Sequence, residues 1–169
     1  MVLGSVVVLL VLQSSARAVS TDGSFSAQIP GGWVRHTGPD LPDGPPTKDD
    51  LMVLLGPISD GVQAHVFIYN RQPGFVDLGQ LDRTWTAGLD QATCRFSGAV
   101  GHFSRMTPTT IGGSAALVTE CRTPTVSVEL ITVNHANRTD MIGFSSASSQ
   151  FAQLRDGALH DLLASWRWN

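Results

Sequence analysis

The chain has 169 residues, 42% of them hydrophobic, and a formal net charge of −3 with a mean hydropathy near zero. A chain of this size and composition fits one globular domain with a sizeable core. The slight excess of acidic residues and the lack of any Lys/Arg cluster in the sequence exclude a nucleic-acid-binding function.

An aliphatic run at 2–12 opens the chain and leads to the small residues Ala16 and Ala18. A signal peptidase requires small residues three and one positions before its cut, and the run is shorter than the ~20 helical residues that cross a bilayer. The sequence therefore predicts an exported protein that is secreted or held in the cell envelope. No cysteine follows the run closely, so no lipid attachment is expected.

The predicted boundaries are a signal peptide at 1–18, cleavage between Ala18 and Val19, and one mature domain at 19–169. Signal peptides usually begin with Lys or Arg, and neither precedes the apolar run. Two alternatives therefore stay open. One is an uncleaved anchor, which would be the only attachment to a membrane, and the other is a buried first strand.

The chain contains two cysteines, Cys94 and Cys121. Outside the cytoplasm an isolated pair in a small domain usually oxidises, and closing a loop of this length would add roughly 3 kcal/mol to stability. A redox or metal pair is the alternative, but the sequence has neither close C-x-x-C spacing nor additional ligands. We therefore predict a structural disulfide.

Along the mature chain, apolar patterning predicts strands first, then a helix, more strands and a last helix. The predicted strands lie at 24–30, 51–55, 62–69, 100–107, 114–122, 125–133 and 139–145. A helix at 78–92 is expected to begin at Asp77 as N-cap, and the last helix at Ser148 or Ser149. The apolar stripe of the last helix is Phe151, Leu154, Ala158, Leu162 and Trp166.

Turns between these elements indicate how the sheet is built. Asp60–Gly61 predicts a hairpin, and the strand after it alternates, with Ala64, Val66 and Ile68 on one face and His65 on the other. Prolines and aspartates at 36–50 predict an exposed loop. Short connections favour an antiparallel sheet flanked by amphipathic helices, which is the α+β class.

No catalytic or metal-binding motif appears in the sequence. The serines of Gly143–Ala147 and Ile111–Ser114 do not complete a nucleophile elbow, and the histidines have no metal-ligand spacing. Glu120 and Glu129 fall in predicted strands and could form an acid–base pair. We favour surface ion pairs instead, such as Glu120 with Arg122. No cofactor or metal is expected, and an enzyme is not predicted.

The opening FSAQIPGGW (25–33) resembles the start of PsbP-like domains, where a short strand runs into a P-G-W turn. The helix with Trp85, the turn into the strand at 111–115, the long hairpin at 125–145 and the final helix follow in the same order. The export signal and the Arg/Ala/Gly bias are most similar to secreted actinobacterial LpqN-like proteins, many of which have a lipid-anchored cysteine that this chain lacks. The resemblance implies an α/β/α sandwich whose relatives are binders or adaptors with no catalytic residues.

Three functions remain open at this point. The first is a non-catalytic extracytoplasmic protein that recognises a partner protein or an apolar envelope molecule such as a lipid, by the 36–50 loop or a groove between the 78–92 helix and the sheet. The second is a secreted hydrolase. Its site would combine Ser145 or Ser114 with His135 and Glu129. The third is an assembly factor that shields apolar segments of other proteins.

Overall fold

The computed structural model describes residues 16–37, 50–72, 74–96 and 98–169. Most of the predicted loop at 36–50 lies outside these residues. The strands are β1 (Arg17–Val19), β2 (Phe25–Gln28), β3 (Val34–Arg35), β4 (Asp50–Ser59), β5 (Val62–Gln72), β6 (Thr93–Phe96), β7 (Ala99–Phe103), β8 (Thr107–Ile111), β9 (Ser114–Arg122), β10 (Val126–His135), β11 (Arg138–Ala147) and β12 (Arg167–Trp168). The helical elements are α1 (Leu78–Ala87), η1 (Leu89–Gln91), α2 (Phe151–Leu154), η2 (Arg155–Leu159) and α3 (His160–Ala164).

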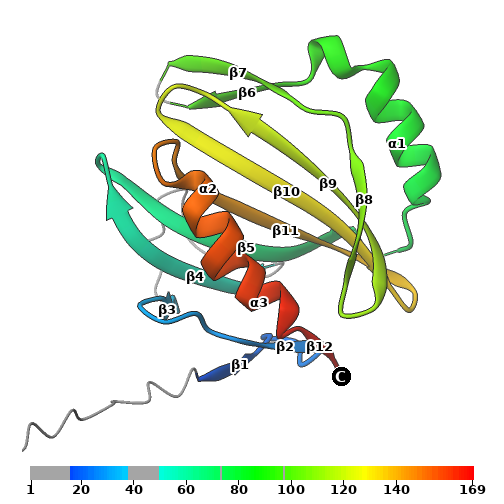
Figure 1. Ribbon diagram of the computed structural model, residues 1–169. Coiled ribbons are helices and arrows are strands. Elements are labelled where there is room, and N and C mark those ends of the chain that lie inside the picture. The colour runs from blue at the N-terminus through cyan, green and yellow to red at the C-terminus, as the bar shows by residue number, and fades with distance from the viewer. Residues whose placement is uncertain (1–15, 38–49, 73, 97) are drawn as a thin grey trace, which may run out of the picture.

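Two antiparallel sheets make up the fold. The large sheet runs β3-β4-β5-β11-β10-β9-β7-β6, with β8 also paired to β9, and the small sheet runs β1-β2-β12. Helices α2 and α3 cross one face of the large sheet, and α1 lies away from them beside β8 and β9 (Figure 1). This arrangement confirms the predicted α+β class. No helix in the described ranges is both long and apolar enough to span a bilayer.

The main core lies between the large sheet, the small sheet and the α2–α3 segment. Side chains from alternate positions of β5, β10 and β11 fill it, as period-two alternation requires. At the base of the core the rings of Phe25 and Trp166 stack with centroids 4.1 Å apart, which joins β2 to the end of the last helix. Trp33 is buried in the same cluster.

The last helix differs from the prediction in two ways. Neither candidate cap serves, because the hydroxyl of Ser149 donates to Asp60 and that of Ser148 donates to the carbonyl of Thr123. Its middle turn, η2, is π-helical, which adds a residue to the turn and rotates the apolar face. Leu159 is buried in consequence, while the predicted Ala158 is half-buried.

Several strand boundaries also differ. β4 continues through Gly56–Pro57, where a register irregularity accommodates the proline and a Cβ at Gly56 would meet the ring of Trp33. The predicted 100–107 strand is divided between β7 and the start of β8, because residues 104–106 between them are not part of a strand. The predicted helix at 78–92 is also shorter, since α1 ends at Ala87. The sequence analysis missed the short edge strands β6 and β12 altogether.

The predicted cleavage position lies inside a strand of this structure. Ala18 is buried, and Arg17 donates to the hydroxyl of Ser26 at 2.9 Å and to the carbonyl of Ser165 at 3.1 Å. Cleavage between Ala18 and Val19 stays a prediction, and it would remove these contacts. The aliphatic run at 2–12 lies outside the described residues.

Candidate binding site

The face of the large sheet opposite α2–α3 is the candidate site. It carries the alternate side chains of each strand that point away from the core, including His65, as the alternation predicted, and Phe67 and Tyr69 of β5. Their rings follow one another along the strand, with Phe67 and Tyr69 stacked at 5.6 Å between centroids. We call this surface the α1 face, because α1 lies over part of it.

Beneath α1 the face contains a cavity of about 420 Å³, which we call the apolar hollow. Among its described lining residues most side chains are hydrophobic, three are threonines, and none is Asp, Glu, Lys, Arg or His. The lining residues are Tyr69, Val76, Leu81, Trp85, Met106, Thr119, Leu130, Thr132, Thr139 and Met141. A cavity of this size and character is typical of a site for a small apolar ligand.

Polar contacts hold both ends of α1 over the hollow. At its start, the carboxylate of Asp77 accepts from the backbone N–H of Gln80 at 2.9 Å, which confirms the predicted N-cap. Just before the helix, the amide of Asn134 donates to the carbonyl of Val76 at 2.7 Å. At its other end, the indole N–H of Trp85 donates to the carbonyl of Ser104 at 3.0 Å.

Between these ends, α1 packs loosely. Its apolar residues at helical spacing, the stripe that predicted the helix, are half-buried, and none of its residues is fully buried. A helix anchored at both ends and loosely packed between them leaves room below it for a guest molecule. The predicted groove between this helix and the sheet is therefore present.

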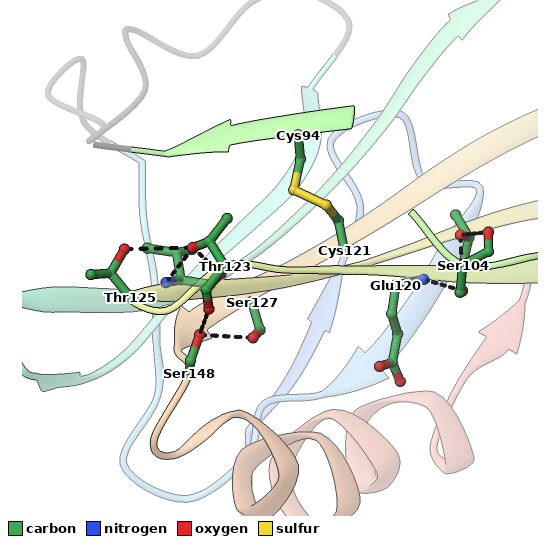
Figure 2. Close-up of a disulfide and its surroundings, with 10 residues drawn as sticks. Cys94, Ser104, Glu120, Cys121, Thr123, Thr125, Ser127 and Ser148 are labelled. Atoms are coloured by element: carbon green, nitrogen blue, oxygen red, sulfur yellow. Dashed lines mark hydrogen bonds between the residues drawn. A yellow bond between two sulfur atoms is a disulfide. The ribbon is translucent and has the colours of Figure 1, made fainter. Parts of the chain in front are cut away.

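A second hollow, of about 460 Å³, lies farther along the same face. Near this hollow, the disulfide joins Cys94 on β6 to Cys121 on β9 (Figure 2), and β7 lies between these two strands in the sheet order. The crossing requires Gly101 on β7, where a Cβ would collide with the backbone of Arg122. Beyond the disulfide, β6 presents Arg95 and Phe96 to the second hollow.

Phe67 marks the boundary between the two hollows. It lines the second hollow and stacks on Tyr69, which lines the apolar hollow. Its ring lies over Gly143 of β11, where any Cβ would overlap it. The glycine therefore lets an aromatic ring lie flat on the sheet between the two cavities.

The structure brings together parts of the predicted hydrolase site. The hydroxyl of Ser114 lies 2.8 Å from Nδ1 of His135, and that of Ser145 lies 3.0 Å from Nδ1 of His65. Glu129 joins neither pair. It precedes His135 by six residues on the same extended strand, a separation of about 20 Å at 3.3–3.4 Å per residue. The proposed combination of Ser, His135 and Glu129 is therefore wrong as a site.

The two glutamates also have different environments. Glu120 makes the predicted ion pair with Arg122, at 2.7 Å, and a second with Arg155. Glu129 was expected at the surface, but it lies on the core side of β10 and is 8% exposed. Burial raises its pKa to about 7, and the charge of Glu120 directly across the strand pair adds to the shift.

Sequence reasoning missed most of the hollow's lining on the sheet. Leu130, Thr132 and Met141 alternate with core residues, so their spacing indicated strands but not a cavity. In the described part of the chain, no group of three or more His, Cys, Asp or Glu could hold a metal ion.

No protein family model and no curated protein matches this chain. Among solved structures, it is similar to the cyanobacterial PsbP (CyanoP) of Synechocystis sp. PCC 6803, with a TM-score of 0.56 and 15% identity over 99% of each chain. It is also similar to LpqN of Mycobacterium tuberculosis, a protein involved in cell envelope biogenesis, with a TM-score of 0.53 and 12% identity over 89% of this chain and 88% of that one. At these identities the likeness concerns the fold, and the chain has a PsbP-like fold.

Proposed function

We propose that this protein is a non-catalytic binding protein that works outside the cytoplasm and holds an apolar molecule in the hollow beneath α1. The observation that carries the proposal is the apolar hollow itself, about 420 Å³, with no acidic, basic or histidine side chain among its described lining residues. Such a lining gains free energy by removing apolar surface from water.

Two further observations support a working location outside the cytoplasm. The aliphatic run and A-x-A ending at 2–18 have the pattern of an export signal. The disulfide between Cys94 and Cys121 persists in oxidising compartments and is rare in the cytosol. The similar fold of LpqN, whose role is in cell envelope biogenesis, supports a location in the envelope or the secreted fraction.

Trp85 lines the hollow and can report occupancy directly. We expect 11-bromo-undecanol, an uncharged alkyl chain carrying a heavy-atom quencher, to quench tryptophan fluorescence saturably in the wild-type protein. The quenching should be lost in Trp85→Phe, although three other tryptophans remain. Quenching of the same size in Trp85→Phe would place the probe elsewhere and contradict the proposal.

A charge within the hollow provides the specificity test. Met141→Lys places an ammonium among the lining residues and should weaken binding at least about tenfold, because desolvating that charge costs more than 1.4 kcal/mol. Phe75→Lys is the matched control, since Phe75 is 62% exposed and outside the hollow. Equal binding by the two folded variants would exclude the apolar hollow as the site.

A hydrolase is the second candidate, and the Ser114–His135 hydrogen bond favours it. Within the described residues no carboxylate hydrogen-bonds to His135, whose ring stacks on Trp168 at 4.2 Å. A serine nucleophile usually needs its histidine oriented by a third group. We therefore expect a fluorophosphonate probe to leave Ser114 unlabelled, whereas labelling abolished by Ser114→Ala would establish the second candidate.

A further inference from the structure

The core side of the large sheet contains a carboxyl group that has no hydrogen-bond donor among the described residues. Glu129 on β10 is 8% exposed, and none of the described residues donates a hydrogen bond to it. Among the described residues, the buried side-chain atoms without a hydrogen bond belong to His36, Asp140 and Trp166, so the oxygens of Glu129 retain access to solvent or to a guest. Burial raises the pKa of this carboxyl to about 7.

The charges around Glu129 do not balance. Glu120 faces it across the β9–β10 pair and binds Arg122 and Arg155, and Arg155 also donates to Asp156 at 2.8 Å. Ionised Glu129 makes three carboxylates against two guanidinium groups. One negative charge is therefore uncompensated, which favours a bound monocation over an anion.

Space for a guest exists next to this carboxyl. A cavity of about 360 Å³, which we call the carboxylate hollow, lies between β10 and the last helix. Its lining residues are Glu129, Arg155, Asp156, Leu159, His160 and Leu163. The helix is π-helical at Arg155–Leu159, directly over the hollow, and π-helical turns occur frequently at functional sites.

We propose that the carboxylate hollow binds a primary ammonium group on an alkyl stem, with Glu129 as the acceptor and Leu159 and Leu163 against the stem. A metal ion fits poorly, because the described residues contain no group of three metal-ligating side chains. An ammonium group needs fewer protein ligands than a metal ion, because it is a compact monocation whose three N–H donors can bind carboxylate and water oxygens. This site lies on the opposite side of the sheet from the apolar hollow and is independent of it.

Binding should depend on pH in a defined way. The ammonium competes with the proton for Glu129, so affinity should rise as pH increases through about 7. The other ionisable groups that face the site are Glu120, Arg122, Arg155, Asp156 and His160. His160 is largely exposed and lies 3.6 Å from the carboxylate of Asp161.

The test is a titration of the Glu129 carboxyl carbon by NMR on selectively labelled protein, with n-butylammonium chloride as probe. We expect a saturable decrease of the Glu129 pKa by roughly one unit, which corresponds to tenfold tighter binding to the ionised form. Butanol, which has the same stem without the charge, and potassium chloride at equal ionic strength should leave the pKa unchanged. A shift of the same size with potassium chloride would overturn the proposal.

Glu129→Gln keeps the shape and removes the charge, so it should abolish the saturable shifts of the Leu159 and Leu163 methyl signals. Asp161→Asn is the matched control on the same helix, where the side chain is 77% exposed, and it should retain them. Unchanged methyl shifts in Glu129→Gln would also overturn the proposal. Met141→Lys should not affect either result, so failure of this site and failure of the proposed function can be told apart.

Discussion

The two faces of the large sheet come from the same strands but differ in packing. On the core side, alternate residues of β5, β10 and β11 are almost fully buried, among them Ile68, Val133 and Phe144. On the α1 face, their neighbours Phe67, Leu130 and Met141 are half-buried and line hollows. One face is filled by the last helix and the small sheet, whereas the other is covered by one loosely packed helix and a disulfide-held edge.

This difference indicates that one face of the sheet mainly stabilises the domain, whereas the other is available for binding. A filled face contributes most of the stability, because close packing and area removed from water dominate the folding free energy. A partly covered face contributes less, and its unfilled volume can accept a ligand. We therefore expect substitutions on the two faces to lower the free energy of unfolding by different amounts.

The largest expected effect is on the core side. Phe144→Ala should lower the free energy of unfolding by about 3–5 kcal/mol, because a fully buried ring packed against Trp33 and Phe151 would leave a cavity. Leu130→Ala on the α1 face should cost less than about 2 kcal/mol, since that side chain already borders open space. Equal losses in urea unfolding would show that the two faces are equivalent in stability.

The next effect concerns the disulfide that joins β6 to β9 near one edge of the large sheet. Cys94→Ser with Cys121→Ser should lower the free energy of unfolding by about 3 kcal/mol, because 27 residues separate the cysteines and their loop would no longer be closed. Probe binding beneath α1 should persist, because neither cysteine lines the apolar hollow. Urea unfolding and tryptophan quenching on the same variant measure both effects. Loss of binding in the folded variant would show that the two ends of the face are coupled.

The N-terminal strand belongs to the core side alone. A chain beginning at Val19 should be about 2 kcal/mol less stable than one beginning at Ala16, because it loses the contacts of Arg17 and the burial of Ala18. Thermal unfolding of the two chains measures the difference, and probe binding on the α1 face should be equal. Equal stability would mean that cleavage after Ala18 costs the fold nothing.

The smallest expected effect is a pH dependence carried by Glu129. Its folded-state pKa of about 7 exceeds the ordinary value of 4.5, so its contribution is full below 4.5 and is lost as pH rises through 7. Glu129→Gln should therefore be more stable than wild type at pH 8 by roughly 1 kcal/mol after allowance for solvent screening, and the difference should shrink toward pH 5. Denaturant unfolding at both values measures it. A difference independent of pH would exclude the titration of this group as the cause.

Sequence reasoning succeeded where the pattern is local. The Asp60–Gly61 hairpin, the cap at Asp77 and the strand at 114–122 all depend on residues adjacent in the chain, and the structure confirms them. It failed for β6 and β12, which are edge strands of four and two residues, too short to show alternation. The π-helical turn shifted the buried face from Ala158 to Leu159 for a reason that no periodicity reveals.

The sequence by itself determined the class of the fold, the two faces of each long strand and the presence of an amphipathic helix after the first long hairpin. Only the tertiary structure decided which face is filled and which is hollowed, because that depends on where distant helices dock. It also decided that Glu129 is buried with no hydrogen-bond donor among the described residues, while Glu120, on the next strand, binds two arginines. Alternation is a property of neighbouring residues, whereas burial and charge pairing depend on contacts between segments far apart in the chain.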